Sequence, residues 1–138
     1  MADNTFVLEV MTPEKILVKE EAQFAVIPEL TGELGILKNH SPMLAALKIG
    51  VLRYTNANGE VRKLAVNGGF VEVIYNEVKV LTEVAEMAED IDVARAMAAR
   101  ERAMQRLQEK DESINFVRAQ LSLQRAVSRL KATGNFQN

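Results

Sequence analysis

Hydrophobic and polar residues alternate in short runs along the first 85 residues of the chain. Near the N-terminus, Phe6, Leu8 and Val10 fall on one side of an extended segment, and Val7 and Glu9 fall on the other. This period of two, combined with many β-branched residues, is typical of strands that bury one face. The runs that show it cover residues 6–10, 15–18, 24–27, 51–56, 61–66, 70–75 and 78–82.

Turn-forming residues separate these predicted strands. Asn58-Gly59 lies between two of them and supplies the positive φ angles that a tight hairpin requires. We expect Asn67-Gly68-Gly69 and Asn76-Glu77 to turn the chain in the same way. Many short strands without an intervening helical pattern favour an antiparallel β-sandwich over a βαβ fold.

A helical pattern replaces the strands after Asp90. Strong helix formers fill residues 91–109 and 114–131, and the polar residues 110–113 separate them. Asp90 and Ser113 are of the types that cap helix N-termini, and Gly134 supplies the left-handed conformation that ends a helix. A short polar link between two helices favours an antiparallel pair.

The composition divides at the same place. Up to Glu86 the chain has 8 basic and 12 acidic residues, and after it 9 basic residues, seven of them arginine, and 7 acidic ones. All three prolines and six of the seven glycines precede residue 70. We therefore expect an α+β chain with an antiparallel β-sandwich in residues 1–86 and a two-helix antiparallel hairpin in residues 87–138. A hairpin of about 40 residues is too small for a core of its own, so it must pack on the sandwich, a partner or a ligand.

Each predicted helix carries an arginine stripe roughly opposite an apolar stripe. The arginines are Arg95, Arg102 and Arg106 on the first helix and Arg118, Arg125 and Arg129 on the second. The apolar residues are Val93, Met97 and Met104 on the first helix and Phe116, Leu123, Val127 and Leu130 on the second. In one interpretation the apolar stripes pack and the arginines are solvated. In the other the arginines converge on an anion, since their planar forks suit phosphate or carboxylate, and a polyphosphate is the obvious candidate.

Few side chains are suited to catalysis. The chain has no cysteine and one histidine, His40, without a serine, carboxylate or second histidine spaced to form a proton relay with it. We interpret His40 as capping a turn or bonding to backbone before Pro42, not as a general base. The glycines of residues 32–50 lack the spacing of a phosphate-binding loop. An enzyme with its own metal or catalytic dyad is therefore not expected.

Charge and hydropathy also exclude some partners. A net charge of −2 and few aromatic residues argue against nucleic acid. No apolar stretch approaches the roughly 18 residues of a membrane span, and the N-terminus lacks the pattern of an export signal. We expect a cytoplasmic protein, or one on the face of a complex, without direct membrane insertion.

These features together resemble the epsilon subunit of bacterial F-type ATP synthase. The resemblance extends from Phe6 to Leu130 and rests on a combination of motifs that are each weak alone. They are the sandwich pattern with Gly32-Glu33-Leu34-Gly35-Ile36-Leu37 and His40-Ser41-Pro42, the segment Gly68-Gly69-Phe70-Val71-Glu72-Val73, and the C-terminal hairpin. In addition, Ile91-Asp92-Val93-Ala94-Arg95-Ala96 reproduces a pattern shared by the family members that bind ATP.

The resemblance implies a non-catalytic rotor subunit, peripheral at the cytoplasmic side of the bacterial cell membrane. The sandwich would bind the gamma subunit and the c-ring, and a mobile hairpin would inhibit ATP hydrolysis by reaching the catalytic beta and alpha subunits. No catalytic cofactor is implied, and ATP would be a regulatory ligand. Its implied site residues are Glu86, Ile91, Asp92, Arg95, Ala96, Arg102, Arg125 and Arg129. Glu33 and His40 would belong to the loop that faces the c-ring.

Two alternatives remain open at this point. The hairpin of the same subunit could act as a mechanical brake that binds no ATP, with its arginines contacting only protein. Without the resemblance, the residues also fit a free-standing β-sandwich adaptor whose hairpin binds a partner.

Overall fold

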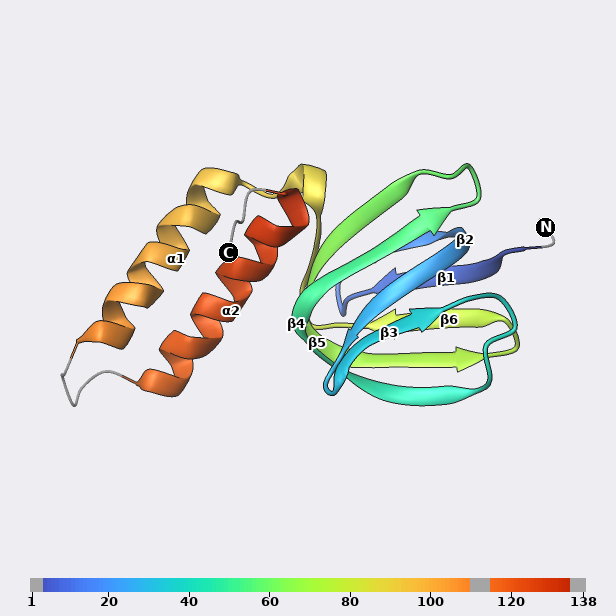
Figure 1. Ribbon diagram of the computed structural model, residues 1–138, viewed down its shortest axis with the longest axis horizontal. Coiled ribbons are helices and arrows are strands. Elements are labelled where there is room, and N and C mark those ends of the chain that lie inside the picture. Colours follow the sequence, from blue (N-terminus) through green and yellow to red (C-terminus); the bar gives the residue numbers. More distant parts are fainter. Residues whose placement is uncertain (1–3, 110–114, 135–138) are drawn as a thin grey trace.

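A computed structural model of the protein describes residues 4–109 and 115–134 (Figure 1). The N-terminal part of the described chain forms one seven-stranded sheet. Its strands are β1 Phe6–Met11, β2 Ile16–Glu29, β3 Gly32–Ile36, β4 Met43–Asn56, β5 Val61–Ile74, β6 Glu77–Leu81 and β7 Ala85–Met87. A short 3₁₀ turn, η1 Ala88–Asp90, then leads to helices α1 Val93–Gln108 and α2 Phe116–Thr133.

The sheet closes on itself to form the sandwich. Its strand order is β1-β6-β5-β4-β2-β3, and β1 also pairs with β2, so that five strands complete a ring. The pairings are antiparallel, as predicted, except that β1 runs parallel to β6. The interior is filled by the inward-facing residues of the alternating pattern. Among the most buried are Phe6, Leu8, Val10, Ile27, Ile36, Leu52, Tyr54, Leu64 and Val71.

Several predicted strands are parts of longer ones. β2 and β5 each include two of the predicted runs, and β3 was not predicted at all. The turn expected at Asn67-Gly68-Gly69 is wrong, because these residues lie inside β5. Gly69 has φ 109°, and a Cβ there would collide with the carbonyl oxygen of Leu81. The glycines therefore bend a continuous strand against β6 and do not reverse it.

The turn predicted at Asn58-Gly59 is confirmed, and the turn predicted at Asn76-Glu77 lies one residue earlier, at Tyr75-Asn76, because Glu77 begins β6. Gly59, with φ 83°, lies in the connection between β4 and β5. Tyr75 and Asn76 both have positive φ, 50° and 61°, in the connection between β5 and β6. Asparagine tolerates this conformation better than most residues, and Tyr75 adopts it in a 90% exposed position. These tight connections make β4, β5 and β6 sequential neighbours in the sheet.

The helix boundaries differ slightly from those expected. The N-cap of α1 is Asp92, whose side chain accepts a hydrogen bond from the Arg95 backbone N–H, so the assignment of Asp90 as cap is wrong. Asp90 instead ends the η1 turn that precedes the helix. Asn115 caps α2, and the predicted cap Ser113 lies outside the described residues. Gly134 ends α2 in the left-handed conformation, as predicted.

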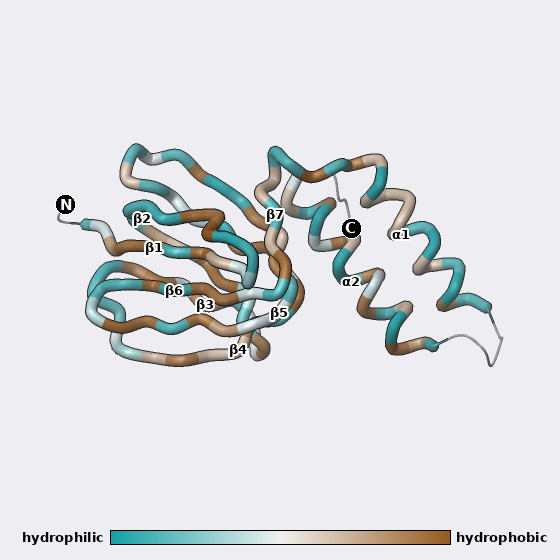
Figure 2. Tube along the Cα trace, turned by 180° about the vertical axis from the view of Figure 1, so that it is seen from behind, coloured by the Kyte–Doolittle hydropathy of each residue, from teal (hydrophilic) through white to brown (hydrophobic). Residues whose placement is uncertain are grey.

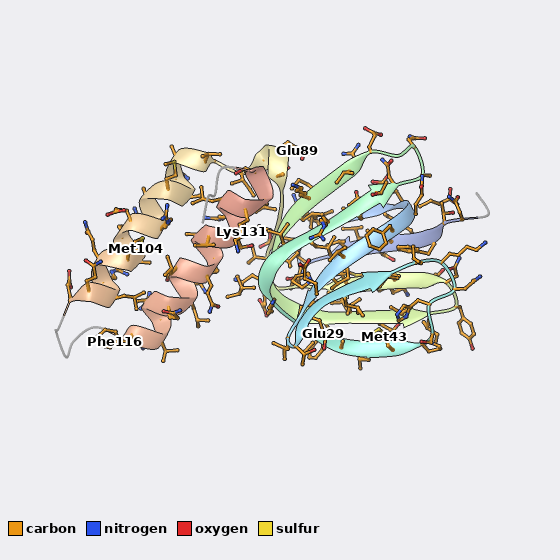
Figure 3. The ribbon with its side chains drawn as sticks, in the orientation of Figure 1. Glu29, Met43, Glu89, Met104, Phe116 and Lys131 are labelled. Atoms are coloured by element: carbon orange, nitrogen blue, oxygen red, sulfur yellow. The ribbon has the colours of Figure 1, made fainter. Side chains whose placement is uncertain are left out.

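The helices form an antiparallel hairpin in which α2 lies between α1 and the sandwich (Figures 1 and 2). Small residues are buried where the helices pack, and they include Ala96 and Ala103 of α1 and Ala119 and Ala126 of α2. The larger apolar residues are not all used, since Met97 is 54% and Phe116 49% exposed. Figure 3 shows Phe116 at the end of α2 that is remote from the sandwich. The prediction that the apolar stripes pack is therefore right only in part.

The outer faces of β4 and β5 carry α2. Ala132 of α2 packs with Ala65 of β5 and with Ile91 in a small apolar cluster. The buried Ser128 hydroxyl donates a hydrogen bond of 2.7 Å to the carbonyl oxygen of Gly50. Within the described residues, neither helix is long and apolar enough to cross a membrane.

Candidate functional site

A pocket of about 250 Å³ opens between the two helices and the sandwich. Arg102 and Arg106 reach it from α1, and Arg125 and Arg129 reach it from α2. Its sandwich side is formed by residues of β4, β5 and β7, among them Asn67 and Glu86. Four of the six arginines of the two predicted stripes thus line one cavity, whereas Arg95 and Arg118 do not line it. We call this cavity the arginine pocket.

Helix periodicity explains how the arginines meet. Arg102 and Arg106 are four residues apart on α1, and so are Arg125 and Arg129 on α2. Residues with this spacing lie on one face of a helix, one turn above the other. Because the helices are antiparallel neighbours, the two pairs project toward the same space.

Glu86 partly balances the charge of the arginine pocket. The Nε–H of Arg129 donates a hydrogen bond of 2.6 Å to Oε1 of Glu86, and both side chains are partly buried. Arg125 donates to the hydroxyl oxygen of Ser122 at 3.2 Å. Among the described lining residues, four arginines therefore face one carboxylate. A site with this excess of guanidinium groups is suited to a ligand with several negative charges.

The residues of the Ile91–Ala96 motif do not line the arginine pocket. Ile91 is buried against Ala65 and Ala132, and Ala96 is fully buried where α1 packs. Asp92 caps α1 and lies 3.6 Å from Nε of Arg95, whose side chain is 87% exposed. Since Arg95 precedes Arg102 by two helical turns, it lies about 10 Å further along α1.

The structure thus brings together half of the predicted ATP-site residues, namely Glu86, Arg102, Arg125 and Arg129. It leaves Ile91, Asp92, Arg95 and Ala96 at the start of α1. It also adds Arg106, which the stripe contained but the family pattern did not single out. Ser122 and Asn67 line the arginine pocket without a sequence signal, because their positions depend on how α2 docks on β5.

Glu33 lies within β3 and His40 lies beyond its end, so the two residues are not in one loop. Glu33 lies in β3, where its Oε2 accepts a hydrogen bond of 2.9 Å from Arg53. His40 lies in the connection from β3 to β4, at the end of the sandwich away from the helices (Figure 1). Its Nδ1 is 2.8 Å from the Ser41 carbonyl oxygen, which confirms the expected bond to backbone. In the described chain, no group of three acidic or histidine side chains is arranged to hold a metal.

A second polar cluster lies where the sandwich meets η1. The hydroxyl of Tyr54 donates a hydrogen bond of 2.6 Å to Oε2 of Glu20. Burial, followed by this bond to a carboxylate, raises the pKa of Tyr54 well above its usual value. Arg62 lies within 4 Å of carboxylate oxygens of Glu20, Glu60 and Glu89. Its position between the strands and η1 indicates a structural role.

Comparison with known proteins identifies two matching domains. The beta-sandwich domain of the ATP synthase delta/epsilon chain matches residues 5–88, and the long alpha-helix domain of the same chain matches residues 89–134. The ATP synthase epsilon chain of Pelotomaculum thermopropionicum is 54% identical over 134 residues, which are 97% of this chain and 99% of the relative. That of Carboxydothermus hydrogenoformans is 55% identical over 134 residues, 97% and 98% of the two chains.

Solved structures share the fold at lower identity. A chain of the Euglena gracilis mitochondrial ATP synthase, in a cryo-EM structure of OSCP, F1 and the c-ring, superimposes with a TM-score of 0.78 at 24% identity. The match covers 87% of this chain and 76% of that chain. A chain of the central stalk and c-ring of the Tetrahymena thermophila enzyme gives 0.57 at 18% identity, with 92% and 95% covered.

The comparisons rule out the free-standing adaptor. The two domain matches describe the delta/epsilon chain of ATP synthase, the relatives are ATP synthase epsilon chains, and both kinds of match extend over nearly the whole chain. The chain belongs to the ATP synthase delta/epsilon chain family and is a non-catalytic, epsilon-type subunit of that complex.

Proposed function

We propose that the chain is a rotor subunit in the central stalk of a bacterial F-type ATP synthase and that its helical hairpin senses ATP. The sandwich, residues 1–86, would bind the gamma subunit and the c-ring, with His40 on the side of the contact, whereas Glu33 lies beside α2 and would not take part in it. The hairpin, residues 87–138, would regulate ATP hydrolysis by the alpha and beta subunits. The protein would then be peripheral, at the cytoplasmic side of the membrane.

The arginine pocket is the observation that carries the ATP proposal. Its lining includes four arginines and one glutamate, and a polyphosphate is the small ligand that complements such a set. The two helices would be held together against mutual repulsion of the guanidinium groups when phosphates occupy the space between them. Glu86 already supplies part of this compensation through its bond to Arg129.

The size of the arginine pocket limits how ATP would bind. Its 250 Å³ lie just below the roughly 300 to 1,000 Å³ of typical ligand pockets. We therefore place the phosphate chain among Arg102, Arg125 and Arg129 and the nucleoside further along α1 toward Arg95. The exposed side chains of Asp92 and Arg95 would meet the nucleoside there. Ile91 and Ala96 are buried, so they would support the adenine side by fixing the start of α1.

Regulation follows from where the arginine pocket lies. It is formed jointly by α1, α2 and the sandwich, so it exists only while the hairpin is docked. A ligand that binds only the docked form stabilises it by about 2.7 kcal/mol at a hundredfold excess over Kd. Abundant ATP would keep the hairpin docked, and falling ATP would release it toward the catalytic subunits. The arginines would then be free to pair with acidic residues there.

Calorimetric titration of the full chain with ATP tests the proposal. We expect saturable binding by the wild type, in the micromolar to millimolar range, and a loss of about tenfold or more in Arg125→Ala, which removes one charged hydrogen-bond donor. Arg118→Ala is the matched control, since it removes an exposed arginine of α2 that does not line the arginine pocket. Absence of binding by the wild type, or equal affinity in Arg125→Ala, contradicts the ATP site.

One observation favours the mechanical brake as the second candidate. The short bond between Arg129 and Glu86 already joins α2 to β7 without a ligand. If this contact alone holds the hairpin, the chain should bind no ATP, whether the hairpin is docked or released. Glu86→Gln should then release the hairpin from the sandwich. Binding of ATP by the wild type excludes this brake.

A further inference from the structure

A second and larger cavity lies on the other side of α2. It measures about 680 Å³, is open to solvent, and is lined by α2 together with β2, β3, β4 and β5. Leu123, Gln124, Val127 and Lys131 line it from the helix. This volume exceeds that of the arginine pocket and lies within the range of small-ligand pockets. We call this cavity the lateral groove.

The lateral groove and the arginine pocket use different faces of α2. At 100° per residue, Val127 and Lys131 lie roughly 120 to 160° around the helix from Arg125 and Arg129. Ser128, which bonds to Gly50 and touches both cavities, lies between these faces. A ligand in the lateral groove would therefore not contact Arg125 or Arg129.

Positive charge is concentrated in the lateral groove. Four basic residues line it, namely Lys48, Arg53, Lys63 and Lys131, and the one acidic residue in its lining is Glu33. Figure 3 shows Lys131 on the part of α2 that adjoins the sandwich. Glu33 accepts a hydrogen bond of 2.9 Å from Arg53, so its carboxylate neutralises one of the four basic side chains. The described lining thus carries a clear excess of positive charge.

The sheet register places two of these basic residues side by side, and Glu33 compensates only Arg53. Arg53 of β4 and Lys63 of β5 are direct partners across the antiparallel pair. Like charges placed opposite one another destabilise a sheet. The adjacent outward pair, Val51 and Ala65, packs in the apolar cluster that also holds Ala132 of the docked helix. The two cations are therefore held beside α2 by the same strands that carry the helix.

We propose that the lateral groove is a second anion site, which binds a small molecule that bears a polyphosphate group. The phosphates would contact Lys48 and Lys63, with Lys131 closing the site from α2. Pro28, Val51 and Val127 supply an apolar wall that an organic part of the ligand can cover. Because the lateral groove needs both α2 and the sandwich, its ligand stabilises the docked hairpin independently of the arginine pocket.

Titration of the full chain in the Arg125→Ala background tests this site apart from the arginine pocket. The probe is inorganic tripolyphosphate, and we expect saturable binding that survives Arg125→Ala. Adding Lys63→Gln should weaken it roughly tenfold, whereas Lys63→Arg should retain it. Lys79→Gln is the control for net charge, because Lys79 on β6 is paired with Glu72 across the sheet and does not line the lateral groove.

The outcomes separate this site from the ATP proposal. Binding of tripolyphosphate that is weakened by Lys63→Gln and not by Lys79→Gln supports the lateral groove, whatever Arg125→Ala does to ATP. Loss of all binding in Arg125→Ala, no binding, or equal weakening by both lysine variants overturns it. Repeating the titration with uridine triphosphate identifies the source. Tighter binding than tripolyphosphate indicates an organic ligand, and equal binding indicates inorganic polyphosphate.

Discussion

The hydrogen bond from Ser128 to Gly50 offers a direct test of how α2 is held. Ser128 is 4% exposed and its hydroxyl donates to the Gly50 carbonyl oxygen at 2.7 Å. Ser128→Ala leaves this buried oxygen without that donor while changing the side-chain volume little. An unsatisfied buried acceptor costs about 1 to 3 kcal/mol. At about 1.5 kcal/mol, the population with the hairpin undocked rises roughly tenfold.

Amide hydrogen exchange measures this population segment by segment. We expect Ser128→Ala to accelerate exchange in α2 by roughly tenfold and to leave the amides of β1 and β6 unchanged, since local opening exposes only the released element. Ser122→Ala is the control, because it removes a serine hydroxyl of the same helix that accepts a hydrogen bond from the Arg125 side chain. Equal exchange in both variants, or acceleration throughout the sandwich, would refute the view that this bond holds α2 locally.

Three other substitutions test single features of the fold. Gly69→Ala should lower the free energy of unfolding, measured in urea, by more than about 3 kcal/mol, because the added Cβ would collide with backbone. Gly59→Ala, where the added Cβ meets open space, should lower it by only about 1 kcal/mol. Similar losses in the two variants would contradict this explanation. The raised pKa of Tyr54 makes the unfolded state ionise first, so stability should fall above about pH 10, and Tyr54→Phe should lessen that fall. If the free energy of unfolding of Tyr54→Phe falls with pH as steeply as that of the wild type, ionisation of Tyr54 is not the cause. Asp92→Ala should cost about 1 kcal/mol of stability by removing the α1 cap, and Asp92→Asn should retain most of it, both measured by thermal unfolding.

Much of the sandwich follows from local sequence. Alternation around Phe6 and the tight turn at Gly59 fix which residues face inward and which strands are neighbours. The failure at Gly68-Gly69 has a physical cause, because the same residues that reverse a chain also bend a continuous strand. Which of the two occurs depends on pairing with β4 and β6, and Gly69 pairs with Leu47 inside the ladder.

The candidate site was predictable only as far as helix periodicity reaches. The spacing of Arg102 and Arg106, and of Arg125 and Arg129, predicts two stripes, and the folded hairpin brings them to one pocket. Which faces of the helices pack was not predictable, because small alanines such as Ala96 are buried there and larger apolar residues are exposed. Contacts between distant segments, including the Arg129 bond to Glu86, depend on that docking.

The lateral groove had no signal in the sequence. Arg53 and Lys63 are ten residues apart and become neighbours only through the register of the hairpin around Gly59. Lys131 joins them because α2 returns to the outer face of β4 and β5. Positive charge in this region is thus a property of the assembled fold and not of any one segment.

The central claim is that ATP holds the hairpin against the sandwich through the arginine pocket. The chain has no cysteine, so spin labels can be placed at two exposed positions by Asn58→Cys and Gln120→Cys. Pulsed electron resonance then gives the distance distribution between the sandwich and α2. We predict that ATP narrows the distribution to the docked distance and that Arg125→Ala abolishes this effect. A distribution that ATP leaves unchanged or shifts to longer distances would contradict the account.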